Sequence, residues 1–281
     1  MNPTEPNSQI AANVVAVRQR IREAAIRSGR SETDVTLVAV TKYASTTDGI
    51  VEALLAAGCR DLGESRPQNL VEKAELFTPC LCSLPPWGRD RVGGIGAREK
   101  QHPHPNPLPK GEGTKDSIHW HLIGPLQRNK VRKILPLVSL IHSVDSVRLA
   151  EAIDRIAAEL SEETGKPIKP SCLLEVAISD DATKCGFDLD ELPTVLDRLA
   201  VFRSISFCGL MGMAGLDADA STVRRQFAAL RCLAESLQLR GTPDNVSLTE
   251  LSMGMSGDFE MAIEEGATLV RVGSLLYSET E

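Results

Sequence analysis

Lys42 closes a short apolar segment, and its position suits a lysine that reacts with carbonyl compounds. The segment VTLVAVTK (35–42) is β-branched and too short for a helix, so it predicts a strand. Because side chains alternate along a strand, Val38, Val40 and Lys42 share one face, and Tyr43 turns to the other. A partly desolvated lysine favours the free amine that attacks a carbonyl. The alternative is a lysine whose ammonium group merely reaches solvent from the strand end.

An arginine and several small residues near the C-terminus predict an anion site. In TLVRVG (268–273), alternation puts Leu269, Arg271 and Gly273 on one face. The segments LSMGMS and VGS supply small side chains and main-chain N–H groups, as the phosphate sites of (β/α)₈ barrels do. A reactive lysine, an inward arginine and a phosphate cup together indicate pyridoxal 5'-phosphate as the cofactor.

Eight predicted strands alternate with helices along most of the chain. The strands are 35–42, 59–63, 118–124, 140–144, 172–178, 205–213, 246–252 and 268–273. Predicted helices lie at 8–29, 47–57, 67–76, 126–135, 146–161, 189–200, 219–239 and 258–266. This α/β alternation predicts one (β/α)₈ TIM-type barrel over residues 1–281, with an extra N-terminal helix. A doubly wound sheet is the alternative fold, but no GxGxxG follows the first strand.

Residues 77–116 interrupt this pattern. They are rich in proline and glycine and show neither the strand period nor the helix period. Such a composition buries too little apolar surface to offset the entropy of ordering, so we expect a disordered insertion. We also expect its removal to leave cofactor binding intact. Two close pairs within it, Cys80 with Cys82 and His102 with His104, fit no common zinc spacing.

Composition excludes several classes of function. The 281 residues carry 31 basic and 38 acidic side chains, and the net charge of −7 argues against nucleic-acid binding. No apolar run reaches the roughly 18 residues of a membrane span, and the N-terminus has no signal-peptide pattern. The seven cysteines are therefore read as reduced thiols. We expect a cytoplasmic protein that contacts no membrane and, having no obvious partner face, is a monomer.

Several motifs together resemble the YggS/PROSC family of pyridoxal phosphate homeostasis proteins. They are VAVTK, LGESRPQ, WHLIGPLQRNK, HSVDS, SDDATKCGF, GLMGM and LSMGMSGDFEMAIEEGATLVRVGS. The resemblance covers nearly the whole chain outside 77–116. It implies a single barrel similar to the N-terminal domain of alanine racemase, covalently bound pyridoxal phosphate and no robust enzymatic activity. Apo forms of pyridoxal phosphate enzymes are the partners that such a role suggests.

The resemblance also implies a set of cofactor-binding residues: Lys42, Ser252, Met253, Arg271, Gly273 and Ser274. Lys42 matches the lysine that forms the Schiff base. The two serines and the glycine match the phosphate contacts, and Arg271 matches the arginine beside the cofactor. Lys184 matches a family lysine near the barrel mouth to which no role is assigned.

Two departures from the family pattern lie at strand ends. Ser65 stands where the family usually has asparagine, and so does Ala177. A polar contact near the cofactor is therefore in doubt, which bears on affinity more than on binding itself.

Three functions are compatible with these residues. The first is a non-catalytic carrier and regulator of pyridoxal phosphate, the second an amino-acid racemase, and the third a Schiff-base aldolase without cofactor. Racemisation needs an acid–base group on each face of the α-carbon. Tyr43 and Tyr277 are expected to be poorly placed for that role, and the chain ends too soon after the eighth strand for a further domain, which favours the carrier. His119 and His121 share a face, but no third metal ligand is evident, so we expect a structural role.

Overall fold

The computed structural model describes residues 5–77, 117–179 and 185–278. The predicted insertion lies outside these ranges except for Phe77, and so does Lys184. Phe77 ends helix α3 (Pro67–Phe77) and packs against the core, so the helix continues one residue further than we expected. Within the described ranges, no helix combines the length and apolar character that a membrane crossing requires.

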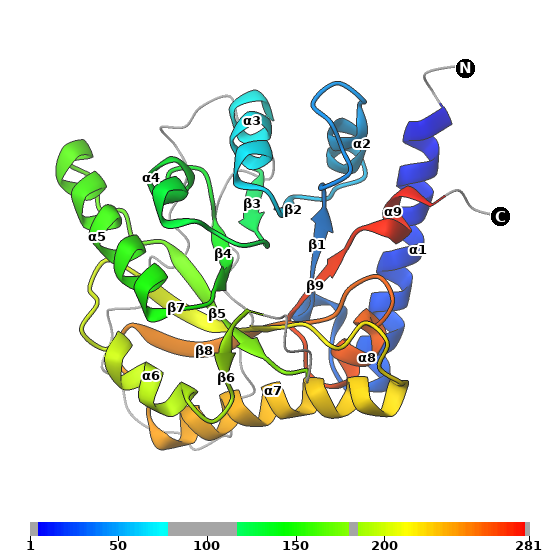
Figure 1. Ribbon diagram of the computed structural model, residues 1–281. Helices are drawn as coiled ribbons and strands as arrows, with labels where there is room; N and C mark the ends of the chain where they lie inside the picture. Colours follow the sequence, from blue (N-terminus) through cyan, green and yellow to red (C-terminus); the bar gives the residue numbers. More distant parts are fainter. Residues whose placement is uncertain (1–4, 78–116, 180–184, 279–281) are drawn as a thin grey trace, which may run out of the picture.

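Eight parallel strands close into a barrel in the order β1, β2, β3, β4, β5, β7, β8, β9 and back to β1 (Figure 1). Their bounds are β1 (Thr36–Val40), β2 (Asp61–Glu64), β3 (His119–Leu122), β4 (Leu140–Val144), β5 (Ser171–Ala177), β7 (Ser206–Gly212), β8 (Val246–Ser252) and β9 (Leu269–Val272). A two-residue strand, β6 (Phe187–Asp188), adds to the side of β5. The predicted (β/α)₈ barrel is confirmed. The doubly wound alternative is wrong because the last strand, β9, pairs with the first, β1, and so closes the sheet.

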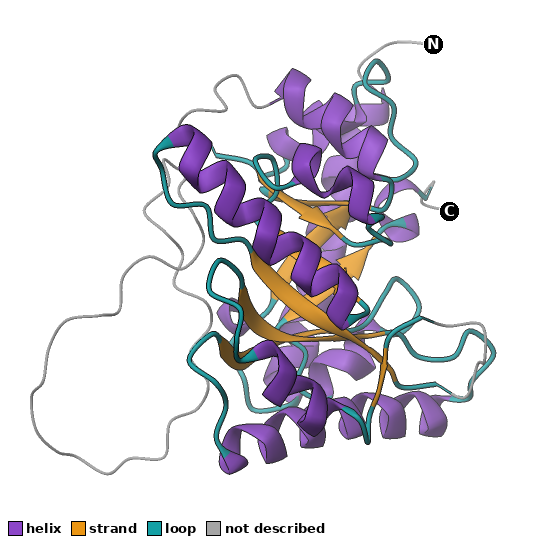
Figure 2. Cartoon of the chain, turned by 60° about the vertical axis from the view of Figure 1, so that its left-hand side comes forward, coloured by secondary structure: helices purple, strands orange, loops and turns teal. Residues whose placement is uncertain are grey.

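Helices cover the outside of the sheet (Figure 2). They are α1 (Glu5–Arg27), α2 (Ile50–Ala56), α3, α4 (Val131–Ile134), α5 (Val147–Thr164), α6 (Leu192–Leu199), α7 (Ala220–Arg240), α8 (Phe259–Glu264) and α9 (Ser274–Tyr277). The extra N-terminal helix α1 lies beside α9 (Figure 1). The amide of Asn13 joins them by donating to the carbonyl oxygens of Leu276 and Ser278, at 3.2 and 2.8 Å.

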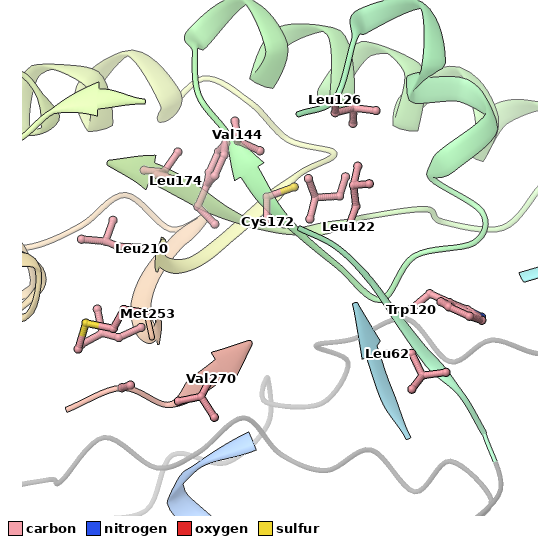
Figure 3. Close-up of a cluster of buried hydrophobic side chains, with 14 of the residues drawn as sticks. Leu62, Trp120, Leu122, Leu126, Val144, Cys172, Leu174, Leu210, Met253 and Val270 are labelled. Atoms are coloured by element: carbon pink, nitrogen blue, oxygen red, sulfur yellow. The ribbon is translucent and has the colours of Figure 1, made fainter. Parts of the chain in front are cut away.

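Side-chain alternation divides the core into two layers. On β5, Cys172 and Leu174 face the helices, in the layer that contains Trp120 (Figure 3). Leu173 faces the barrel interior, where the apolar cluster is small: Val38, Leu140, Leu173, Cys208, Met211 and Leu269. The remaining interior positions are largely polar, and polar groups that leave water must be hydrogen-bonded. The barrel interior therefore contains polar side chains that could form a binding site.

Glycine at 124 lets the ends of two strands approach each other. A Cβ atom at that position would lie 2.2 Å from the main-chain oxygen of Ser65, so only glycine fits. The carbonyl oxygen of Gly124 accepts a 2.6 Å hydrogen bond from the hydroxyl of Ser143. The segments that follow β2 and β3 are thus held together at the carboxyl edge of the barrel.

Candidate cofactor site

Lys42 lies in a turn just beyond β1. The strand ends at Val40, and the N–H of Ala44 donates to the carbonyl oxygen of Thr41 at 3.0 Å. Lys42 and Tyr43 are both exposed, and Nζ of Lys42 lies 4.8 Å from the centre of the Tyr43 ring. The expectations of a desolvated Lys42 and of a Tyr43 turned away from it are wrong. Side chains alternate between the two faces only within a strand, and β1 ends at Val40.

A buried ion pair between Lys73 and Glu64 holds this turn in place. Nζ of Lys73 donates to Oε2 of Glu64 at 2.5 Å and to the carbonyl oxygen of Thr41 at 2.7 Å. The other carboxylate oxygen of Glu64 accepts from the N–H groups of Ser65 and Arg66, at 2.8 and 3.1 Å. Both ionic groups therefore have several partners, as buried charges require. The hydrogen bond from Lys73 to the carbonyl oxygen of Thr41 therefore holds the residue before Lys42 in place.

Sequence reasoning missed Lys73, although a signal existed. Lys73 lies on the same face of α3 as the buried residues Leu70 and Ala74. A lysine at an apolar position of an amphipathic helix indicates a buried acidic partner.

The start of α9 packs directly on β1. A Cβ atom at Gly273 would lie 3.3 Å from Cβ of Val40, so this residue brings the main chain close to the Lys42 turn. The N–H of Gly273 donates to the hydroxyl of Ser256 at 3.1 Å, and Ser274 is exposed beside it. Two hydroxyl groups and a main-chain donor therefore lie beside the Lys42 turn.

Arg271 points into the barrel, as alternation predicted. It pairs in register with Val38, is 4% exposed, and donates to Oγ of Ser252 and to the carbonyl oxygen of Gly212, at 2.5 and 3.1 Å. Burial lowers the pKa of Arg271 to about 10, against the opposing effect of Asp258 and Glu175. The guanidinium is therefore still charged at neutral pH and acts only as a donor.

A chain of hydrogen bonds continues from Ser252 through the barrel. Oγ of Ser252 lies 2.8 Å from Nδ1 of His142, and Nε2 of His142 lies 2.9 Å from Nδ1 of His121. Nε2 of His121 lies 3.2 Å from Oδ1 of Asp61. We call Asp61, His121, His142, Ser252 and Arg271 the interior chain. Both histidines and Ser252 are fully buried.

His119 and His121 meet at Asp61 rather than at a metal. Nδ1 of His119 lies 3.2 Å from the same carboxylate oxygen that His121 contacts. In the part of the chain that the structure describes, no three histidine, cysteine, aspartate or glutamate side chains form a metal-binding group. Sequence reasoning did not foresee the link to His142, because its spacing of 21 residues from His121 follows no motif.

Glu175 is a second interior residue that sequence reasoning missed. It alternates with the outward-facing Leu174 and Val176, which was a usable signal. Burial and the nearby charge of Asp145 raise the pKa of Glu175 to about 7, although Arg271 opposes them. A carboxyl group that titrates near neutrality therefore lies inside the barrel.

The other predicted site residues occupy different environments. Ser252 is buried against His142 and Arg271 rather than open to solvent. The side chain of Met253 packs in the layer under the helices, so only its main chain faces the site edge. Ala177 ends β5, and Ser65 follows β2.

A separate hollow opens beside this edge of the barrel, between the loop after β3 and the start of α5. Its volume is about 610 Å³, and its lining includes Arg128, Asp145 and Arg148. The residues matched to the cofactor do not line it, so we give it no part in the site.

Comparison with known proteins places the chain among proteins that handle pyridoxal phosphate. Residues 9–281 match the profile of the family described as alanine racemase, N-terminal domain. The pyridoxal phosphate homeostasis protein of Synechocystis is 34% identical over 87% of this chain and 91% of its own length. PipY of Synechococcus elongatus, solved with pyridoxal phosphate bound, is 33% identical with a TM-score of 0.69, over 96% of this chain and all of PipY.

Alanine racemase of Clostridium difficile shares the fold at greater distance. Its TM-score is 0.65 at 14% identity, and the match covers 96% of this chain and 57% of the racemase. This likeness shows a common barrel only.

Proposed function

Because the chain belongs to the alanine racemase N-terminal domain family, and within it to the pyridoxal phosphate homeostasis proteins, we propose that it binds pyridoxal phosphate covalently at Lys42 and helps to maintain the supply of this cofactor. The observation that carries the proposal is the position of the exposed Lys42 amine. The amine projects from a turn in which Lys73 donates a hydrogen bond to the carbonyl oxygen of Thr41. The donor groups around Gly273 lie beside this turn.

The residues around Lys42 fit a phosphorylated aldehyde. When bound, pyridoxal phosphate supplies an aldehyde carbon that an unprotonated amine attacks. Lys42 supplies that amine from an exposed position. The hydroxyls of Ser256 and Ser274 and the N–H of Gly273 would hold the phosphate, since oxyanions are bound by hydroxyl and main-chain donors. Ser252 is left out of this set because it is fully buried and bonded to His142 and Arg271.

We propose that the chain holds the cofactor without turning over amino acids. Tyr277 ends α9 and lies close to the Lys42 turn, but its hydroxyl already donates to the carbonyl oxygen of Val40 at 2.5 Å. Burial raises the pKa of Tyr277, so the phenol stays protonated and cannot act as a base. Arg271 can only donate a hydrogen bond, which disfavours protonation of a pyridine nitrogen beside it and weakens the ring as an electron sink.

The exposed Lys42 turn also suits exchange of the cofactor with other proteins. We therefore propose apo forms of pyridoxal phosphate enzymes as partners. Mixing the loaded protein with such an apo-enzyme and following the recovery of its activity measures this transfer. Transfer slower than the spontaneous release of cofactor into buffer would contradict the exchange role.

A titration with pyridoxal phosphate tests covalent binding. We expect a visible absorbance band in the natural chain and in Lys166→Arg, which changes another exposed lysine, in the loop after α5. The band should be absent in Lys42→Arg, whose guanidinium does not attack aldehydes. An equal band in Lys42→Arg would contradict the proposal.

A second experiment tests the absence of turnover. The loaded protein is incubated with L-alanine, L-serine or L-glutamate in heavy water. We expect little deuterium at the α-carbon. Rapid deuteration that depends on Lys42, with accumulation of the D-enantiomer, would instead establish a racemase.

A further inference from the structure

The hollow beside the loop after β3 is formed by two segments that leave neighbouring strands. Residues 126–129 follow β3 and residues 145–149 follow β4, and these two strands are parallel and paired. Both segments therefore lie at the carboxyl edge, where (β/α)₈ barrels bind their ligands. The volume of about 610 Å³ is within the range of small-molecule sites, roughly 300–1,000 Å³. The hollow has the size and the place of a ligand site.

This hollow is separate from the candidate cofactor site. Strand β2 lies between β3 and β1, and the Lys42 turn follows β1. None of the residues matched to the cofactor lines the hollow. A ligand bound there is therefore a different molecule from the one at Lys42.

Three charged side chains line the hollow: Arg128, Asp145 and Arg148. Both arginines are exposed and Asp145 is half-buried, so a ligand from solvent can reach all three. The buried Leu126 and Leu149 add apolar surface to the same lining. The hollow thus offers two positive charges, one negative charge and an apolar contact.

These three charged side chains have no partner among the residues that the structure describes. None of them forms a hydrogen bond or an ion pair there, although the chain carries 38 acidic side chains. Arginines outside the hollow on the two adjoining helices do pair: Arg132 of α4 with Glu163, and Arg155 of α5 with Glu159. The charges of the hollow are therefore available to a ligand.

The types of these side chains indicate the chemistry of the ligand. A guanidinium matches a carboxylate through two parallel N–H···O bonds, so two arginines suit two carboxylates. The Asp145 carboxylate repels a further acidic group and attracts an ammonium group. A molecule with two carboxylates and one ammonium group has a net charge of minus one, opposite to the net charge of the three side chains.

We propose that the hollow binds a free dicarboxylic amino acid, with one carboxylate at each of Arg128 and Arg148 and the ammonium group at Asp145. The inference goes beyond the proposed function and does not depend on it, because the two sites share no residue. A phosphate ion or a simple dicarboxylate is a poorer match, since each leaves Asp145 beside an acidic ligand.

Amide NMR tests where the ligand binds. The full chain, labelled with ¹⁵N and free of cofactor, is titrated with sodium L-glutamate at constant ionic strength, because salt screens exposed charges. The cofactor is left out because its aldehyde would react with the amino group of glutamate. We expect saturable shifts of the signals from 126–129 and 145–149, and no shift in the Lys42 turn.

Three further probes test the chemical class. Glutarate lacks the ammonium group, L-glutamine lacks the second carboxylate, and inorganic phosphate lacks both features. Each loses at least one hydrogen bond to a charged group, so we expect binding at least about tenfold weaker than that of L-glutamate.

Variants test the three side chains one at a time. Arg128→Gln and Arg148→Gln should each weaken L-glutamate binding by about tenfold. Asp145→Asn should remove the preference for L-glutamate over glutarate. Arg155→Gln is the matched control, because it changes an exposed arginine of α5 that does not line the hollow, and it should bind L-glutamate like the natural chain.

The outcomes separate this inference from the proposed function. Equal binding of glutarate and L-glutamate to the natural chain would overturn the amino-acid ligand, and absence of saturable shifts in the two segments would overturn the site. Either result leaves the proposed function intact if the visible band at Lys42 forms. If a variant does not fold, the comparison of probes on the natural chain decides alone.

Discussion

The hydroxyl of Tyr277 donates a 2.5 Å hydrogen bond to the carbonyl oxygen of Val40, the last residue of β1. The ring of Tyr277 also meets the ring of Tyr43 edge to face, with centres 6.3 Å apart. The last helix, itself held to α1 by Asn13, therefore fixes the strand end that carries Lys42. The N-terminal and C-terminal elements thus jointly position the reactive lysine.

Tyr277→Phe should loosen the Lys42 turn. It leaves the Val40 carbonyl without this donor, so we expect a loss of about 1 kcal/mol in the free energy of unfolding and slower formation of the visible band. Urea denaturation and stopped-flow absorbance measure the two effects. Tyr43→Phe is the control, because Tyr43 is 63% exposed and its ring remains. Equal rates in Tyr277→Phe and the natural chain would show that the turn is fixed by other contacts.

Lys73→Met should be strongly destabilising. It leaves the Glu64 carboxylate buried without its counter-ion, and breaking a buried pair from one side costs about 3–5 kcal/mol. The double variant Lys73→Met with Glu64→Gln should recover much of this loss, because no net charge is then buried. Chemical denaturation of the two variants and of Lys166→Met, an exposed control, measures the free energies. A single variant as stable as the control would refute a structural role for the pair.

Glu175→Gln should change how stability depends on pH. The folded-state pKa of about 7 lies above the ordinary value of 4.5, so the folded chain prefers the protonated carboxyl. Its contribution to stability is therefore complete below pH 4.5 and is lost as the pH rises through 7. At about 1.4 kcal/mol per pKa unit, this difference of about 2.5 pKa units corresponds to a loss of about 3.5 kcal/mol.

The glutamine variant removes this titration. It should match the natural chain near pH 4.5 and exceed it in stability above pH 7. Thermal or urea unfolding across this range provides the measurement. Parallel pH profiles for the two proteins would contradict the raised pKa.

Deletion of residues 78–114 should leave the barrel and its cofactor site intact. The expectation follows from the composition of the segment and from its position between α3 and β3. Phe77 is retained because it packs against the core. Circular dichroism and the visible band measure folding and binding. Loss of either in the deleted chain would mean that the segment contributes to the structure.

Local patterns were sufficient to predict the barrel but not its polar interior. Cys172 and Leu174 face the helices and Leu173 faces the barrel interior, so both faces of β5 are apolar. Such a pattern is visible in consecutive residues of the sequence. The interior chain instead joins residues 60 and 110 positions apart, and only closure of the barrel brings them together. Alternation also failed at Lys42, because β1 ends at Val40 and the main chain turns at Lys42.

Chemical trapping at Lys42 tests the central proposal most directly. The natural chain is loaded with pyridoxal phosphate, reduced with borohydride, digested and mapped by mass spectrometry. We predict that the modified peptide contains Lys42 and that the modification disappears in Lys42→Arg. A modified peptide containing only Lys184 would contradict the assignment, and so would a chain that carries no modification after loading.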